Sequence, residues 1–328
     1  MLSAILLFAL IIHVAGGAPV KVLTILLTGG RSWYGVGEAM VKAIPILLCA
    51  LAVAVPGRMG LTNIGGEGQF LLGTIGASAC AIIAPSLHPY ILLPLMLLAA
   101  AALGIIWGLI PGALKSLTRT DETVISLLLN YVAGLFLLHL VHGALKDPAG
   151  MGWPQSVQFS ENARLSGLFG TRLHWVVVLA AGAALLLAWM WRATTVGFSA
   201  RVVGANPTLA RHMKISVPGY YMAGFAIAGA LAGIAGFGEV SAIHGRLREG
   251  VSLGYGYAGF FVSWLCGHRF ALCIPASFAY ALVITGADSL QIETGLPFAT
   301  IYVFQGVLFL ACLLIQRESS RQITKTDE

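Results

Sequence analysis

The sequence is poor in charged residues, and this scarcity is its most informative property. Only 10% of the 328 residues are charged and 58% are apolar, whereas a soluble domain carries roughly 25% charged residues. Nine segments contain no Asp, Glu, Lys or Arg: 1–20, 43–57, 68–114, 123–145, 173–191, 215–238, 250–268, 270–287 and 294–316. A helix needs about 20 mostly apolar residues to cross the hydrocarbon core. The composition therefore predicts an integral protein of the lipid bilayer.

The sequence also lacks the short motifs of common catalytic and nucleotide-binding sites. It contains no GxxxxGK[ST] phosphate loop, no HExxH and no GxSxG, which excludes ATP binding by that loop and leaves an enzymatic role without support. Its five cysteines show neither CxxC nor Cys/His ligand spacing, so a metal site is not expected. We therefore predict no catalytic residue, no metal and no cofactor in this chain.

The spacing of the apolar segments predicts about ten transmembrane helices. The 68–114 segment is long enough for two spans and is interrupted by Pro85 and Pro89. Five helices then fill a first half, 1–142, and five fill a second half, 173–316. Because five is odd, the second half enters the bilayer in the opposite sense, as in the inverted repeats of many transporters. The expected fold is all-α: a single transmembrane domain over 1–328, built from two inverted five-helix repeats.

Basic residues give the chain its orientation. The segment 192–214 contains four basic residues and no acid, and the positive-inside rule places such a loop in the cytoplasm. The formal charge of +6 is explained in this way, without nucleic acid as a partner. Counting spans from this loop makes 143–172 an external loop and 317–328 a cytoplasmic tail.

Two glycine-rich breaks occupy corresponding places in the two halves. The first is the polar island Thr62–Gln69, and the second is Leu253–Tyr257. Polar, irregular backbone at membrane depth is tolerated where protein or a water-filled path surrounds it, and paired breaks point to a transport path. The alternative is that glycine, with 40 residues, is simply common in membrane helices.

The first break contains Asn63, Glu67 and Gln69. An acidic side chain inside the membrane needs water or a hydrogen-bond partner. Glu67 therefore either lines the water-filled transport path or forms a hydrogen bond that locks a hinge in the backbone. Alternatively, Asn63 caps a helix that starts near Ile64, and Glu67 is an acid in its first turn.

Other candidate path residues are uncharged. Tyr255 and Tyr257, separated by a glycine, could present their rings to a ligand or belong to an interfacial aromatic belt. Asn130 and Gln305 lie inside apolar segments, where amide side chains either tie helices together or line a path. Small residues recur at helical spacing between 223 and 236, which predicts close packing of helix backbones.

The loop 192–217 differs from the other connections. Ser199–Lys214 is predicted to be a short amphipathic helix, with Asn206 as a cap and Pro207 in a first turn. Such a helix either lies on the lipid surface or fits a groove in a partner protein.

These segments resemble the permease subunit of bacterial ATP-binding-cassette (ABC) importers of the ribose and nucleoside type. Asn63–Gln69 resembles the NIGAEGQ box of the nucleoside branch, and Val203–Ile215 resembles the cytoplasmic segment that docks on the ATPase subunit. Two later boxes match at His244–Tyr257 and Thr294–Gly306. The resemblance runs over most of 38–315.

The resemblance implies a multi-pass permease of the bacterial cytoplasmic (inner) membrane that carries a neutral polyhydroxylated solute, a nucleoside or a simple sugar. Its partners would be ABC ATPase subunits that bind ATP, a second permease, identical or different, and an extracytoplasmic solute-binding protein. The implied ATPase-coupling residues are Gly204, Ala205, Asn206, Pro207, Ala210 and Arg211. The alternative is a stand-alone secondary carrier or channel for a small neutral solute, which would need a deep coupling acid.

Overall fold

The computed structural model describes residues 18–28, 32–118, 120–168 and 170–294, together with 303 and 306. Within these residues every regular element is a helix. The α-helices are α2 (Pro19–Thr28), α3 (Trp33–Gly57), α4 (Gly66–Ile83), α5 (Pro89–Thr118), α6 (Glu122–His142), α7 (Val176–Ala193), α8 (Thr195–Ala205), α9 (Pro207–His212), α10 (Val217–Gly238), α11 (Tyr255–Leu265) and α12 (Phe270–Thr294). A short 3₁₀ turn, η2, covers Glu161–Ala163, and a π-helical turn, η3, covers Glu239–His244.

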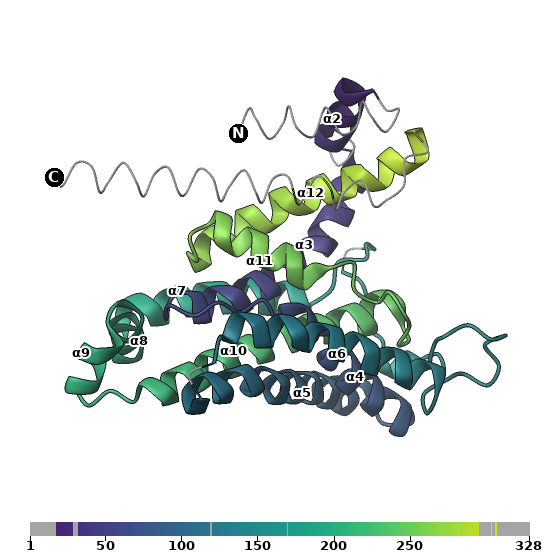
Figure 1. Ribbon diagram of the computed structural model, residues 1–328. Helices are drawn as coiled ribbons and strands as arrows, with labels where there is room; N and C mark the ends of the chain where they lie inside the picture. Colours follow the sequence, from purple (N-terminus) through teal and green to yellow (C-terminus); the bar gives the residue numbers. More distant parts are fainter. Residues whose placement is uncertain are drawn as a thin grey trace. The chain divides into compact units, whose positions relative to one another are not determined.

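The chain divides into two compact units. The larger unit covers 41–278, and the smaller one combines 1–40 with 279–328. Within the larger unit, α8 and α9 lie at the end opposite to the loop that joins α6 to α7 (Figure 1). All the described site residues discussed below belong to this unit.

Six helices of the described chain are long and apolar enough to cross a membrane. They are α3, α4, α5, α6, α7 and the continuous stretch Val217–His244, and Phe270–Gly286 is a shorter apolar helix. The predicted division of 68–114 is confirmed, since α4 ends at Ile83 and α5 begins at Pro89. The total of ten spans and the inverted repeat remain predictions, because most of 1–20 and 294–316 lies outside the described residues, as does the tail 317–328.

The charge pattern is a poor guide to the start of the chain. The residues 21–42 lie between the charge-free segments 1–20 and 43–57, yet most of α2 and the beginning of α3 lie in them. A helix accepts single charged residues near its ends, where long side chains reach the interface. For this reason α3 begins ten residues before the charge-free run that starts at residue 43.

Close packing of small residues joins α10 to α5 and α4, as the sequence predicted. At the crossing of α5 and α10, Gly104 faces Gly229, and a Cβ on either residue would collide with the carbonyl oxygen of the other. A Cβ on Gly73 of α4 would collide with the backbone of Gly233 on α10, and a Cβ on Gly233 would collide with the carbonyl oxygen of Ala100 on α5. Helices in lipid associate through such packing, because the hydrophobic effect offers no preference for protein over lipid tails.

Replacing Gly229 with Ala should destabilise the protein. The new methyl group collides with the backbone of α5, and overpacking of this kind costs about 1–3 kcal/mol. Gly182→Ala on α7 is the matched control, because nothing lies within 4 Å of a Cβ there. Thermal unfolding in detergent should show a lower Tm for Gly229→Ala and an unchanged or slightly higher Tm for Gly182→Ala. Equal Tm values would contradict the close crossing.

Candidate functional site

The first glycine break contains irregular backbone, and side chains of α6 form hydrogen bonds with three of its amides and one of its carbonyls. Between the end of α3 at Gly57 and the start of α4 at Gly66, residues 58–65 form no helix. Three side chains one turn apart on α6 bind this backbone: Glu122 accepts from the Thr62 amide (3.1 Å), Ser126 from Ile64 (3.2 Å) and Asn130 from Gly68 (2.8 Å). The Asn130 amide also donates to the Ile64 carbonyl (2.9 Å). We call these three α6 residues the α6 ladder.

Sequence reasoning found Asn130 and missed the other two members of the α6 ladder. The available signal was the spacing: 122, 126 and 130 are polar at intervals of four, so they share one face of the helix. Glu122 also forms an ion pair with Lys115 at the end of α5 (Oε2 to Nζ, 2.7 Å). The ladder therefore contacts α5 as well as the polar island Thr62–Gln69.

Glu67 joins the two glycine breaks. Its carboxylate accepts a hydrogen bond of 2.8 Å from the backbone amide of Gly256, in the first turn of α11. The first amides of a helix have no partner within the helix, and a carboxylate near them is favoured by the helix dipole. Gly256 lies directly against the backbone of Gly66 and Glu67. Residues separated by almost 190 positions thus meet at the starts of two helices.

The interpretation of Asn63 as a helix cap is wrong. α4 begins at Gly66 with Gly65 as its N-cap and no side-chain cap. The Asn63 side chain instead accepts from the Gly65 amide and exchanges hydrogen bonds with Gln69, at 3.3 and 3.4 Å. Asn63 and Gln69 are 0% and 1% exposed. In this conformation the pair holds the break together inside the protein.

The two tyrosines of the second break have different surroundings. Tyr255 is buried and its ring lies 5.9 Å from that of Phe70 on α4. Tyr257 is 41% exposed, and its hydroxyl accepts from Asn130 at 3.4 Å. The structure therefore brings Asn63, Glu67, Gln69, Asn130, Tyr255 and Tyr257 into one region, whereas Gln305 lies outside the described residues.

A cavity of about 210 Å³ lies beside Glu67. Apolar residues of α4 and α6 line one side, and the segment 249–252 lines the other. Ser252 accepts from the amides of Gly254 and Tyr255 and lines the cavity together with Glu67. Glu67 is thus both a link between the breaks and a polar group at the edge of a space that a solute could enter.

The predicted loop helix is present as two helices. α8 ends at Ala205 and α9 begins at Pro207, with Asn206 in an extended conformation between them. Proline lacks an amide and disfavours helical backbone in the preceding residue, which explains why a single Ser199–Lys214 helix does not form. The predicted cap is confirmed, since the Asn206 side chain accepts from the amides of Thr208 and Leu209 at 3.0 Å.

The coupling segment, Gly204–Arg211, contacts the residues that directly precede the polar island Thr62–Gln69. A Cβ on Gly204 would lie 2.6 Å from the Arg58 carbonyl and 3.0 Å from the Met59 Cα. Ala210 is buried with Val203 and Val217, whereas Ala205 and Arg211 are exposed. One side of the segment thus packs on the residues that lead into the island, and the other side faces outward.

Comparison with known proteins is consistent with this architecture. The chain is 32% identical over 290 residues to the glucose ABC transporter permease protein of Haloferax volcanii, covering 85% of this chain and 76% of that protein. It is 31% identical over 313 residues to the guanosine ABC transporter permease protein of Bacillus subtilis, covering 92% and 88%. A nucleoside ABC transporter permease protein of Lactococcus lactis is 29% identical over 274 residues, covering 80% and 74%.

A family model described as "Branched-chain amino acid transport system / permease component" matches residues 35–313. This match includes all but the first two residues of α3, the helices from α4 to α12 and both glycine breaks. The chain therefore belongs to this family of multi-pass membrane permease components.

Proposed function

We propose that this permease forms the translocation path of an ABC importer for a neutral polyhydroxylated solute, a nucleoside or a simple sugar, in the bacterial cytoplasmic membrane. The observation that carries the proposal is the coupling segment, which faces outward on one side and packs on Arg58 and Met59, just before the polar island, on the other. The glucose, guanosine and nucleoside permeases to which the chain is similar support this class of solute.

The proposed partners are an ABC ATPase subunit that docks on α8 and α9, a second permease and an extracytoplasmic solute-binding protein. ATP is bound by the ATPase, so this chain needs no cofactor. The basic residues Arg58, Arg192, Arg201 and Arg269 lie close enough together for their charges to interact. By the positive-inside rule, this basic end supports a cytoplasmic position for the coupling segment.

The contacts suggest how ATPase movement reaches the path. Pressure on α8 acts through Gly204 on Arg58 and Met59, which lead into the island. The α6 ladder holds the island, and Glu67 connects it to α11 through Gly256. Rigid-body movement of packed helices is a common way of switching between conformations. The first and second breaks would move together because a charge-assisted hydrogen bond joins them.

Purification of the complex from native membranes in mild detergent tests the proposal directly. Mass spectrometry should identify an ABC ATPase subunit that accompanies the chain. Ala205→Trp should release this subunit, because residue 205 is exposed on the proposed docking side. Ala149→Trp, at an exposed residue of the loop between α6 and α7, should retain it. A chain that is purified alone, and transports in liposomes without ATP, would instead be a secondary carrier.

Gly204→Val should abolish transport while membrane insertion stays normal. The added side chain collides with the backbone of Arg58 and Met59, so α8 can no longer pack on these residues. Uptake of labelled uridine and glucose into proteoliposomes containing the complex measures transport, and membrane fractionation measures insertion. Unchanged ATP-dependent uptake would contradict the proposed role of the contact between the coupling segment and these residues.

Glu67→Gln should reduce ATP-dependent uptake several-fold. The glutamine oxygen can still accept from Gly256, but a hydrogen bond to a charged group is roughly twice as strong as a neutral one. Glu249→Gln is the matched control, because Glu249 lines the same cavity and its exposed side chain makes no bond to α11. Full activity of Glu67→Gln would show that the link between the two breaks is not needed for transport. Equal losses in both variants would assign the effect to the charge of the cavity.

A further inference from the structure

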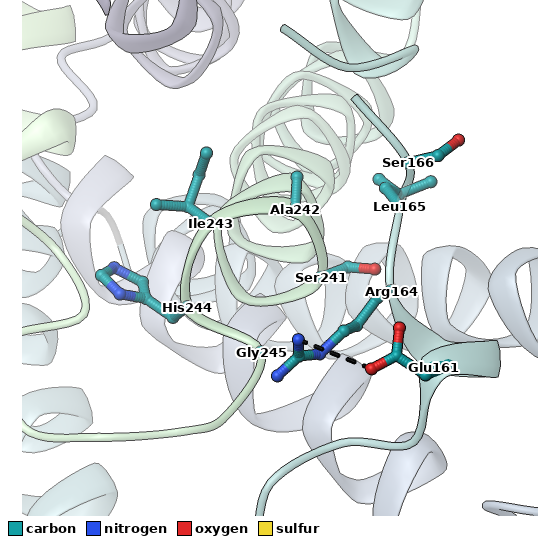
Figure 2. A pocket seen from close by; sticks show the side chains of 9 residues that line it. All are labelled: Glu161, Arg164, Leu165, Ser166, Ser241, Ala242, Ile243, His244 and Gly245. Atoms are coloured by element: carbon teal, nitrogen blue, oxygen red, sulfur yellow. Dashed lines mark ion pairs between the residues drawn. The ribbon is translucent and has the colours of Figure 1, made fainter. Parts of the chain in front are cut away.

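A second, larger cavity lies at the other membrane end of the chain from α8 and α9. It has a volume of about 390 Å³ and is formed between residues 161–166 and the π-helical end of α10 (Figure 2). The span Val217–His244 begins beside the coupling segment and ends at this cavity. At about 1.5 Å per residue, its 28 residues separate the two by about 40 Å. In an importer, this is the end at which the solute arrives.

The walls of the cavity are fixed by hydrogen bonds between two segments far apart in the sequence. The Phe159 amide donates to the Gly245 carbonyl at 2.8 Å, and the Leu165 amide donates to the Ser241 carbonyl at 3.1 Å. The Ser241 hydroxyl donates to Ala163 at 2.7 Å. π-helical turns such as η3 are rare and occur frequently at functional sites. The cavity is therefore a preformed part of the fold.

The polar groups of the cavity retain hydrogen-bonding capacity. Arg164 and Glu161 form an ion pair at 3.8 Å between Nη1 and Oε1 (Figure 2), which is too long for a hydrogen bond. The Arg164 side chain is 32% exposed and makes no hydrogen bond to another described residue; its Nε is buried, so its Nη groups are the ones that can reach a solute. The Glu161 side chain is 90% exposed, and the Ser166 hydroxyl adds a group that can donate and accept.

The charges of the cavity balance, which favours a neutral ligand. Arg164 and Glu161 carry opposite charges, and the remaining basic group, His244, is paired with Glu239 at 3.3 Å. An anion would meet the Glu161 carboxylate, and a cation would meet the Arg164 guanidinium. A polyhydroxylated molecule can instead donate to one and accept from the other, while its C–H surface contacts Leu165 and Ile243. The volume is within the range of small-molecule sites, about 300–1,000 Å³.

We propose that this cavity is a binding site for a neutral polyhydroxylated solute, a nucleoside or a simple sugar, at the outer end of the permease. Arg164 donates to the solute hydroxyl groups, and Glu161 accepts from them. This proposal rests on the proposed function. The cavity would bind the transported class of molecule directly on the permease, before the solute enters the path beside Glu67.

Saturation-transfer NMR on the purified complex in lipid nanodiscs, without ATP and without a binding protein, tests the site. Uridine and glucose are the probes, and at least one should receive saturation from the wild-type protein. Arg164→Gln should weaken its binding roughly tenfold, the usual value of a hydrogen bond to a charged group. Arg248→Gln is the matched control, because Arg248 lies on the same outer surface and does not line the cavity. No transfer to either probe, or equal effects of both variants, would overturn the proposal.

Two further measurements separate this proposal from its alternatives. Uridine monophosphate and gluconate should bind more weakly than uridine and glucose, and a preference for these anions would overturn the neutral class. Loss of a bound extracytoplasmic protein in Arg164→Gln, with solute binding unchanged, would make the cavity a protein-docking surface instead. ATP-dependent uptake by the wild-type complex tests the importer function separately, so transport without NMR binding would refute the site alone.

Discussion

Satisfaction of backbone hydrogen bonds at membrane depth is the constraint on which the rest of this structure depends. Lipid offers no partner for an unpaired amide or carbonyl group, yet residues 58–65 and the start of α11 interrupt the helices. The α6 ladder binds the first break, and Glu67 binds an amide of the second. Two irregular segments can therefore meet inside the protein, and the cavity beside Glu67 forms where they do.

The sequence predicted the features that depend on local chemistry. Apolar runs located most spans, Pro85 and Pro89 divided 68–114 correctly, and Asn206 was identified as a cap. The small residues of 223–236 were correctly assigned to close packing, because small side chains are what allow two helix backbones to come close together in lipid. Asn63, Glu67 and Asn130 were also expected to need partners as polar groups in such segments, and each forms hydrogen bonds in the structure; their role in a transport path remains a prediction.

The partners themselves could not be predicted, because they depend on which helices lie side by side. Nothing near Glu67 in the sequence indicates that it binds the amide of Gly256, and Asn63 has the local appearance of a cap that it does not form. Glu122 lies at the end of a span, where an acid is ordinary; its spacing from Ser126 and Asn130 was the available signal, but its contacts with Lys115 and Thr62 could not be predicted from it. The cavity at Arg164 was missed because the loop between α6 and α7 and the end of the Val217–His244 helix form its walls through backbone bonds, which side-chain identity does not encode.

The α6 ladder also bears on how the protein is made. The amides of Thr62, Ile64 and Gly68 find their partners about 60 residues later in the chain. Until α6 has been synthesised, α3 and α4 therefore carry unpaired backbone groups that lipid cannot accept. The four helices α3 to α6 should consequently leave the insertion machinery for the bilayer as one group, and a chain arrested before residue 122 should be retained there or degraded.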